Sequence, residues 1–181
     1  MNKKIRWITE TAILLALLVT LQALTKPAGQ LVTGSCVNTV LAIAVLVGGL
    51  WSGVTIAVIS PVLAFLLGIA PQILTVPAIM AGNTVFVLLL ALIAGGKNAD
   101  VVHRVVAWLV AAAAKFAVLY AIVVKIICGV LAPTLMEAGT LKEPMLKALP
   151  ATFSWPQLIT ALIGGGIALV IVPIVKKALK K

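Results

Sequence analysis

Long apolar runs separated by short polar breaks constrain this chain more than any other feature of its sequence. The first run extends from Thr9 to Leu24, and similar runs recur up to the basic C-terminus. Hydrophobic residues make up 63% of the chain and charged residues only 10%, against about 25% charged residues in a typical soluble domain. Because a helix needs about 20 apolar residues to cross a bilayer, the 181 residues allow roughly five to seven such helices. The sequence therefore predicts an all-α integral membrane protein, a single compact bundle over residues 1–181.

Proline, glycine and polar residues divide the chain into six predicted transmembrane helices. These helices cover residues 7–25, 35–47, 53–69, 78–94, 101–131 and 155–175. The second and third are short for a hydrocarbon core about 30 Å thick, so they either thin the bilayer or form one re-entrant hairpin. The fifth is longer than one span requires, and we expect it to tilt or protrude. The loop from Pro133 to Ser154 is expected to lie partly over the bundle through Met145, Leu146 and Phe153.

Glycine and proline also predict the connections between these helices. A polar loop joins the first two helices from Lys26 to Ser35, and a tight turn over Gly48 to Gly53 joins the next two. The pair Gly95-Gly96 is expected to cap the fourth helix, since glycine readily adopts the conformation that ends a helix. The run from Gly164 to Gly166 falls within the last helix, where small residues allow close packing against a neighbouring helix.

The distribution of basic residues predicts which side of the membrane each end of the chain faces. Nine lysines and arginines fall at the two ends and in the break before the fifth helix, namely Lys3, Lys4, Arg6, Lys97, Arg104, Lys176, Lys177, Lys180 and Lys181. Three fall in the opposite loops, namely Lys26, Lys142 and Lys147. Because basic flanks mark the cytoplasmic side, both termini are expected in the cytoplasm of a multi-pass cell-membrane protein. The net charge of +10 then reflects topology in a lipid bilayer and does not indicate nucleic-acid binding.

The sequence lacks the residues with which a transporter would drive itself. None of its four acidic residues lies deep in a predicted helix, although ion-coupled carriers usually need such a carboxylate. The segment Gly95-Gly96-Lys97 lacks the first glycine and the hydroxyl that complete an ATP-binding loop. No nucleophile–base pair or zinc-binding spacing is present, and Cys36 and Cys128 could pair or stay as buried thiols. We therefore expect no enzymatic activity, no metal or cofactor, and an energy source outside this chain.

Polar side chains within the apolar runs mark a candidate ligand site towards the outer half of the bundle. A lysine at mid-membrane is costly and usually marks a pathway or ligand site, as expected for Lys115, whereas Lys125 could instead extend to the headgroups. The candidate substrate-binding residues are Asn38, Gln72, Asn83, Lys115, Tyr120, Lys125, Trp155 and Gln157. Two alternatives stay open: the asparagines could only tie helices together, and Trp155 could be a membrane-interface residue.

Two small residues in the first helix mark a candidate docking strip. Ala12 and Ala16 lie one helical turn apart, and such a pair lets a second membrane helix approach closely. Since the chain has no energy source of its own, this strip is the place where a driving partner is expected to attach.

Taken together, these features resemble the substrate-binding S components of energy-coupling factor (ECF) transporters, which import vitamins. The resemblance covers nearly the whole chain and rests on its size, six spans with both ends inside, and the motifs Ala12-x-x-x-Ala16, Thr33-Gly34-x-x-Val37-Asn38 and Gly82-Asn83. It implies a subunit that binds a vitamin or related micronutrient at the outer face, then associates with a transmembrane coupling protein and two cytoplasmic ATPases. On this resemblance the coupling protein docks on the alanine strip, and a lid over the site includes Lys26, Gln30, Thr33 and Ser35.

The ligand and the class of transporter are left open by the sequence. The two lysines of the fifth helix favour an anion, such as a carboxylate-bearing vitamin like pantothenate. A neutral pyridoxine-like or pyrimidine-like ring could instead use the amides and Trp155. The alternative to an ECF component is a stand-alone small-solute carrier or channel, and a subunit without any ligand is a further one.

Overall fold

The described chain is almost entirely helical in the computed structural model, which describes residues 2–69, 72–94 and 100–179. The long helices are α1 (Lys3–Thr25), α2 (Gln30–Ile43), α3 (Leu50–Leu66), α4 (Val76–Ala94), α5 (Val101–Leu119) and α8 (Trp155–Ala178). Two short helices, α6 (Ala132–Glu137) and α7 (Glu143–Thr152), precede α8. π-Helical turns over Ala44–Gly48 and Tyr120–Val130 extend α2 and α5, and 3-10 turns lie at Lys26–Ala28 and Ile73–Thr75.

Within the described residues, five helical segments are long and apolar enough to cross a membrane. They are Lys3–Ala28, Gln30–Gly48, Ile73–Ala94, Val101–Val130 and Glu143–Ala178. The remaining long helix, α3, has 17 residues, so the prediction of a short third helix is confirmed. The second segment has 19 residues and is longer than predicted, because helical turns continue at both of its ends. The helical membrane protein predicted from the sequence is confirmed.

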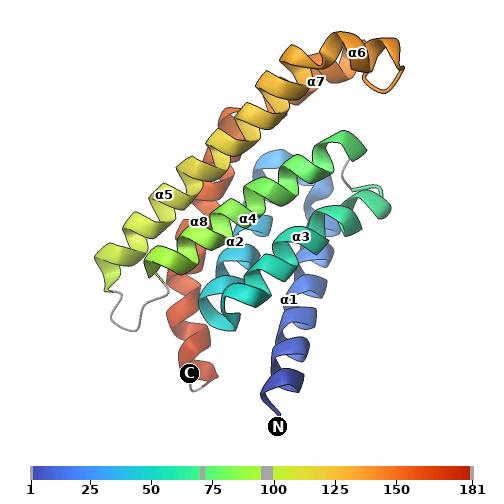
Figure 1. The fold of residues 1–181 in the computed structure, drawn as a ribbon. Helices are drawn as coiled ribbons and strands as arrows, with labels where there is room; N and C mark the ends of the chain where they lie inside the picture. Colours follow the sequence, from blue (N-terminus) through green and yellow to red (C-terminus); the bar gives the residue numbers. More distant parts are fainter. Residues whose placement is uncertain (1, 70–71, 95–99, 180–181) are drawn as a thin grey trace.

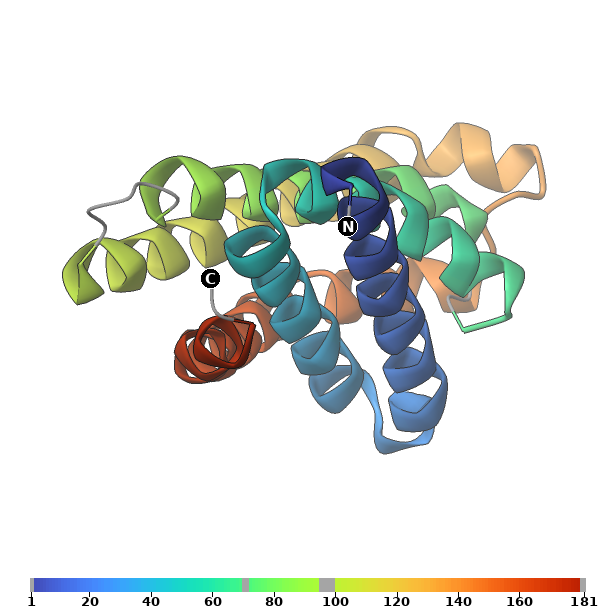
Figure 2. The same ribbon diagram turned by 90° about the horizontal axis from the view of Figure 1, so that it is seen from below.

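Both ends of the chain lie at the same end of the bundle. Figure 1 shows the N- and C-termini together at the lower end, while α6 and α7 lie at the upper end. Figure 2, seen from the lower end, shows α1 and α2 side by side with α8 beside α2, in agreement with their contacts. α4 packs against α5 and α3 on the other side of the bundle. That the end with the termini faces the cytoplasm stays a prediction from the basic flanks.

The connection between α1 and α2 is shorter than the loop predicted from Lys26 to Ser35. A single residue, Gly29 at φ 88°, reverses the chain, and α2 begins directly after it. Glycine adopts positive φ without the clash that a Cβ would cause. Gln30, Thr33 and Ser35 therefore lie on the first turns of α2 and not in a loop. The prediction was wrong because weak helix formers such as serine and threonine were interpreted as a break, whereas packing against neighbouring helices overrides their propensity.

Two further connections differ from the sequence-based expectation. The turn predicted over Gly48 to Gly53 reduces to Gly49 at φ 92°, and α3 begins at the next residue. The loop predicted from Pro133 to Ser154 contains α6 and α7, each with proline in its first turn, where a missing N–H costs no hydrogen bond. The expected cap at Gly95-Gly96 and the position of Lys97 lie outside the described residues.

The glycine run of α8 sets how closely α8 approaches its neighbours. A Cβ on Gly164 would overlap the backbone oxygen of Ser35 and lie 2.7 Å from Cβ of Asn38. A Cβ on Gly165 would overlap the ring of Trp108 on α5. Only glycine therefore allows α2 and α8 to pack at this distance, in line with the packing role predicted for the run. This contact also fixes the part of α2 that carries Asn38.

Candidate functional site

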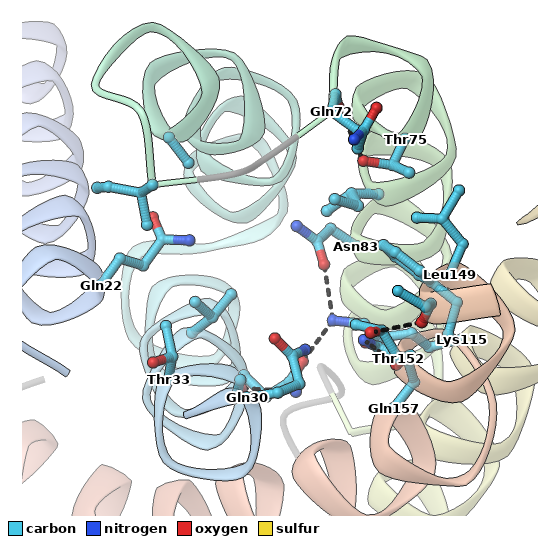
Figure 3. Close-up of a pocket in the computed structure, with 18 of the residues that line it drawn as sticks. Gln22, Gln30, Thr33, Gln72, Thr75, Asn83, Lys115, Leu149, Thr152 and Gln157 are labelled. Atoms are coloured by element: carbon cyan, nitrogen blue, oxygen red, sulfur yellow. Dashed lines mark hydrogen bonds between the residues drawn. The ribbon is translucent and has the colours of Figure 1, made fainter. Parts of the chain in front are cut away.

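A cavity of about 410 Å³ lies at the end of the bundle that carries the α1–α2 and α7–α8 connections. Its volume falls within the roughly 300–1,000 Å³ of small-molecule sites. Five of the predicted binding residues line it, namely Asn38, Gln72, Asn83, Lys115 and Gln157, together with Gln30 and Thr33 of the predicted lid. Figure 3 shows these side chains converging from several different helices.

Lys115 of α5 is the central polar residue of the cavity. Its side chain is 3% exposed, although the residue lies within a membrane-spanning segment. Its Nζ donates hydrogen bonds to Oδ1 of Asn38 at 2.5 Å and to Oδ1 of Asn83 at 2.7 Å. The Nζ also lies 5.6 Å from the centroid of the Phe86 ring, within the range of a cation–π contact. Lys115 thereby joins α5 to α2 and α4 at the wall of the cavity.

Asn38 is held in one orientation by neighbouring groups. Its Nδ2 donates to the backbone oxygen of Gly34 at 2.9 Å and to Oγ1 of Thr160 at 3.3 Å. The hydroxyl of Thr160 in turn donates to the backbone oxygen of Gln157 at 3.1 Å. Since both amide hydrogens are used on this side, the carbonyl oxygen of Asn38 is directed at Lys115. The α2–α8 contact thus positions a group that holds the lysine.

Three side-chain atoms at this cavity are buried without a hydrogen-bond partner among the described residues. They are Oε1 of Gln22, Oγ1 of Thr33 and Nδ2 of Asn83. All three residues line the cavity. A buried polar group without a partner costs about 1–3 kcal/mol, so such groups are normally satisfied by protein, water or ligand. Their convergence on one cavity indicates a site built for a polar molecule.

The wall contributed by α7 and α4 is largely apolar. Met145, Leu149 and Phe153 approach from the α7 region, and Ile79 approaches from α4. The expectation that the segment after α5 lies partly over the bundle is confirmed by these contacts. A hydrogen bond of 3.1 Å from Nε2 of Gln157 to the backbone oxygen of Thr152 ties α7 to α8 at the same wall. The cavity therefore combines one polar side with one apolar side.

Three predicted binding residues do not line the cavity, namely Tyr120, Lys125 and Trp155. Trp155 is 65% exposed and stacks on Phe116 with ring centroids 5.6 Å apart. Lys125 is exposed, and its Nζ lies 5.6 Å from the centroid of the Tyr120 ring. Successive residues of an α-helix turn by about 100°, so the side chain of Tyr120, five residues beyond Lys115, points to another face of the helix. The prediction rested on how far each residue lies towards the outer end of its helix. Which face of the helix carries the side chain was not considered.

Two residues of the predicted lid also lie away from the cavity. The Nζ of Lys26 donates to the backbone oxygen of Gly68 at 2.5 Å, which links the α1–α2 connection to the end of α3. Ser35 donates to the backbone oxygen of Leu31 and lines a separate apolar groove between α1, α2 and α8. Gln30 and Thr33 face the cavity from the start of α2.

Three polar residues that line the cavity are absent from the predicted binding residues, namely Gln22, Thr75 and Thr152. Gln22 is the only amide within α1, which is the same kind of signal that marked Asn38. Thr75 belongs to a 3-10 turn, and Thr152 belongs to α7, where the sequence predicted a loop. These two could be placed only once the helices around them were known.

The candidate docking residues and the cysteines lie apart from this cavity. Ala12 and Ala16 are exposed on α1, with the larger exposed side chains Ile13 and Leu17 beside them. Both cysteines are free thiols.

Comparison with known proteins gives one match. A family model described as the ECF transporter, substrate-specific component matches residues 6–176 of the chain. No curated protein and no solved structure matches it.

Proposed function

This chain belongs to the family of ECF transporter substrate-specific components, and we propose that it captures a small water-soluble vitamin or related micronutrient in the cavity around Lys115. As a member of this family it is an integral plasma-membrane protein that binds a substrate for transport, and it is not an enzyme. It works with the energy-coupling module of an ECF transporter.

The observation that carries the proposal is the buried lysine held by two asparagines at a cavity wall. A lysine within a membrane-spanning segment is costly and usually marks a functional site. Tying helices together would require neither a lysine nor an adjoining cavity of about 410 Å³. The unpartnered atoms of Gln22, Thr33 and Asn83 support the same conclusion, because a bound molecule would satisfy them.

The position of the cavity supports capture from outside the cell. The cavity lies towards the end of the bundle opposite the two termini. If the basic flanks place the termini in the cytoplasm, the cavity faces the outer side. The α1–α2 connection lies at this end, and its link from Lys26 to Gly68 suits a lid that closes over a bound molecule.

Delivery of the ligand requires the partner. We propose that a transmembrane coupling protein docks on the strip formed by Ala12 and Ala16, and that two cytoplasmic ATPases supply the energy. Both alanines are exposed, so the strip is open to a second helix. The strip and Gln22 lie on the same helix, which would connect docking to the cavity wall.

Uptake into liposomes tests this function. The purified chain is reconstituted alone and together with an ECF coupling protein and its ATPases, and the labelled ligand is the small molecule that co-purifies with the chain. We expect uptake only from the complete assembly with ATP. Uptake of similar rate by the chain alone would contradict the proposal and favour a stand-alone carrier or channel.

A further inference from the structure

We propose that the ligand is a small carboxylate monoanion, that Lys115 and Asn83 receive its carboxylate, and that Gln22 and Thr33 bind a hydroxyl or amide group at its other end. This inference rests on the proposed function, because it names the chemical class of molecule that the same cavity takes.

Lys115 has no acidic partner in the described part of the chain. No acidic residue lines the cavity among the described residues. Glu10 pairs with Arg6, Asp100 with His103, and Glu143 lies 3.8 Å from Lys147, all away from this lysine. Among the described residues, the partners of Lys115 are thus neutral oxygen acceptors and an aromatic ring. A buried charge without a partner of opposite sign is strongly unfavourable, and an anionic ligand would supply that partner.

The Nζ of Lys115 keeps one donor position open towards the cavity. The two bonds from Nζ of Lys115 measure 2.5 and 2.7 Å. A protonated lysine has three hydrogens to donate. Two are used by the asparagines, and the third is available to an acceptor in the cavity.

Asn83 is oriented so that it places a second donor beside Lys115. Its Oδ1 accepts from Lys115, so the amide nitrogen is turned away from the lysine. This Nδ2 is buried, has no partner, and points into the cavity in Figure 3. A carboxylate has two oxygens that accept hydrogen bonds, so one can take the free N–H of Lys115 and the other the amide of Asn83. A neutral hydroxyl could not satisfy both donors and also balance the charge.

The opposite wall defines the rest of the molecule. Gln22 projects from α1 towards Asn83 across the cavity in Figure 3. Its Oε1 and the hydroxyl oxygen of Thr33 have no partner among the described residues, so a hydroxyl or amide of the ligand would pair with them. Between the two polar walls the ligand would pass Met145 and Leu149, which require an apolar body.

The same geometry excludes other classes. Cationic ligands would be repelled by Lys115 at close range. Stacking of a neutral ring on Trp155 is not available, because that side chain lies outside the cavity and stacks on Phe116. A dianion would need a second cation, and Lys115 is the only basic residue that lines the cavity in the described part of the chain.

Matched pairs of compounds that differ only in the carboxylate test the class. Binding to the wild-type chain in detergent is measured by calorimetry for pantothenate and pantothenol, nicotinate and nicotinamide, and lipoate and lipoamide. For every pair in which either member binds, we expect the acid to bind at least about tenfold more tightly. Equal or tighter binding of the neutral member would overturn the inference. If no pair binds, mass spectrometry of the molecule that co-purifies decides, and a neutral or cationic molecule would overturn it.

Two variants locate the group responsible for the preference. Lys115→Met keeps most of the length of the side chain and removes its charge, and we expect the acid to lose roughly thirtyfold or more in affinity while its neutral counterpart changes little. Lys125→Met removes an exposed lysine from the same helical segment and should leave both affinities unchanged. An acid preference that persists in folded Lys115→Met protein would overturn the assignment. Failure of the proposed function looks different: no compound of any charge would bind the wild-type chain, and none would co-purify.

Discussion

Lys115 and Lys125 lie on one continuous helical segment, α5 and its π-helical extension, in opposite surroundings. Lys115 is 3% exposed, faces a cavity, and donates to Asn38 and Asn83. Lys125 is exposed and has an aromatic ring as its neighbour. The difference arises from the other helices: α2 and α4 bring two amides to one lysine and none to the other. A lysine in a membrane helix thus becomes a candidate ligand group through what converges on it, and depth along the helix is not sufficient.

The largest expected effect is the difference in ligand affinity between variants of these two lysines. Lys115→Ala should weaken binding of the co-purifying ligand by about 2–5 kcal/mol, since it removes the buried cation with which the proposed carboxylate would pair. Lys125→Ala should leave the affinity unchanged, because its side chain does not line the cavity. Calorimetric titration of both purified variants checks this expectation. Equal losses in the two would remove the distinction between the lysines.

The next effect concerns the packing that positions Asn38. Gly164→Ala would place a Cβ against the backbone of Ser35 and Cβ of Asn38, so α8 must move away from α2. We expect a loss of about 1–3 kcal/mol in the free energy of unfolding, with weaker ligand binding. Chemical unfolding in detergent micelles measures the loss.

Gly129→Ala is the matched control, because Gly129 lies on the same π-helical segment as Lys125. The nearest atom to its Cβ would be the backbone oxygen of Val124 at 3.5 Å, an ordinary contact. Stability should stay the same or rise slightly, since alanine is the better helix former. Equal destabilisation by both substitutions would show that Gly164 has no special role beside Asn38.

A smaller effect is expected from the hydroxyl that orients Asn38. Thr160→Val keeps the shape of the side chain and removes the acceptor of Asn38 Nδ2, which should cost about 0.5–1.5 kcal/mol in ligand binding. Thr9→Val is the control, because Thr9 is exposed on α1 and bonds only its own helix through Ile5. Dissociation constants of the two variants, measured by calorimetric titration, check this expectation. An unchanged affinity in Thr160→Val would mean that Asn38 holds its orientation without this bond.

The smallest effect is expected at the α1–α2 connection. Lys26→Met removes the exposed hydrogen bond to the backbone oxygen of Gly68, and about 0.5 kcal/mol should be lost. If this link closes the cavity, the loss appears as a roughly twofold faster ligand dissociation with an unchanged association rate. Stopped-flow displacement measures both rates. A slower dissociation would contradict a lid at this position.

The helical membrane fold could be predicted well because apolar run length and composition determine it. The same information misplaced the start of α2, since Gly34 and its polar neighbours were interpreted as loop. In the structure Gly34 lies against Thr160 of α8, a contact that no local pattern reveals. Helix α7 was missed because its residues fall inside the loop predicted from Pro133 to Ser154, whereas Pro144 belongs to the first turn of this helix.

The candidate site was predictable where a polar residue stood out in an apolar helix. Asn38, Asn83 and Lys115 carried that signal, and all three line the cavity. Tyr120 and Trp155 carried a similar signal and lie elsewhere, because the phase of a helix relative to its neighbours depends on packing. The sequence alone does not tell which polar atoms lack a hydrogen-bond partner. That Nδ2 of Asn83 is such an atom follows only from the folded structure.

The most direct test is native mass spectrometry of the chain purified from its own cells under gentle conditions, as wild type, Lys115→Met and Lys125→Met. The account predicts one bound small molecule in the wild type and in Lys125→Met, and none in Lys115→Met, with all three proteins folded. The same molecule retained at the same occupancy in Lys115→Met would contradict the claim that this lysine and its two asparagines form the binding site.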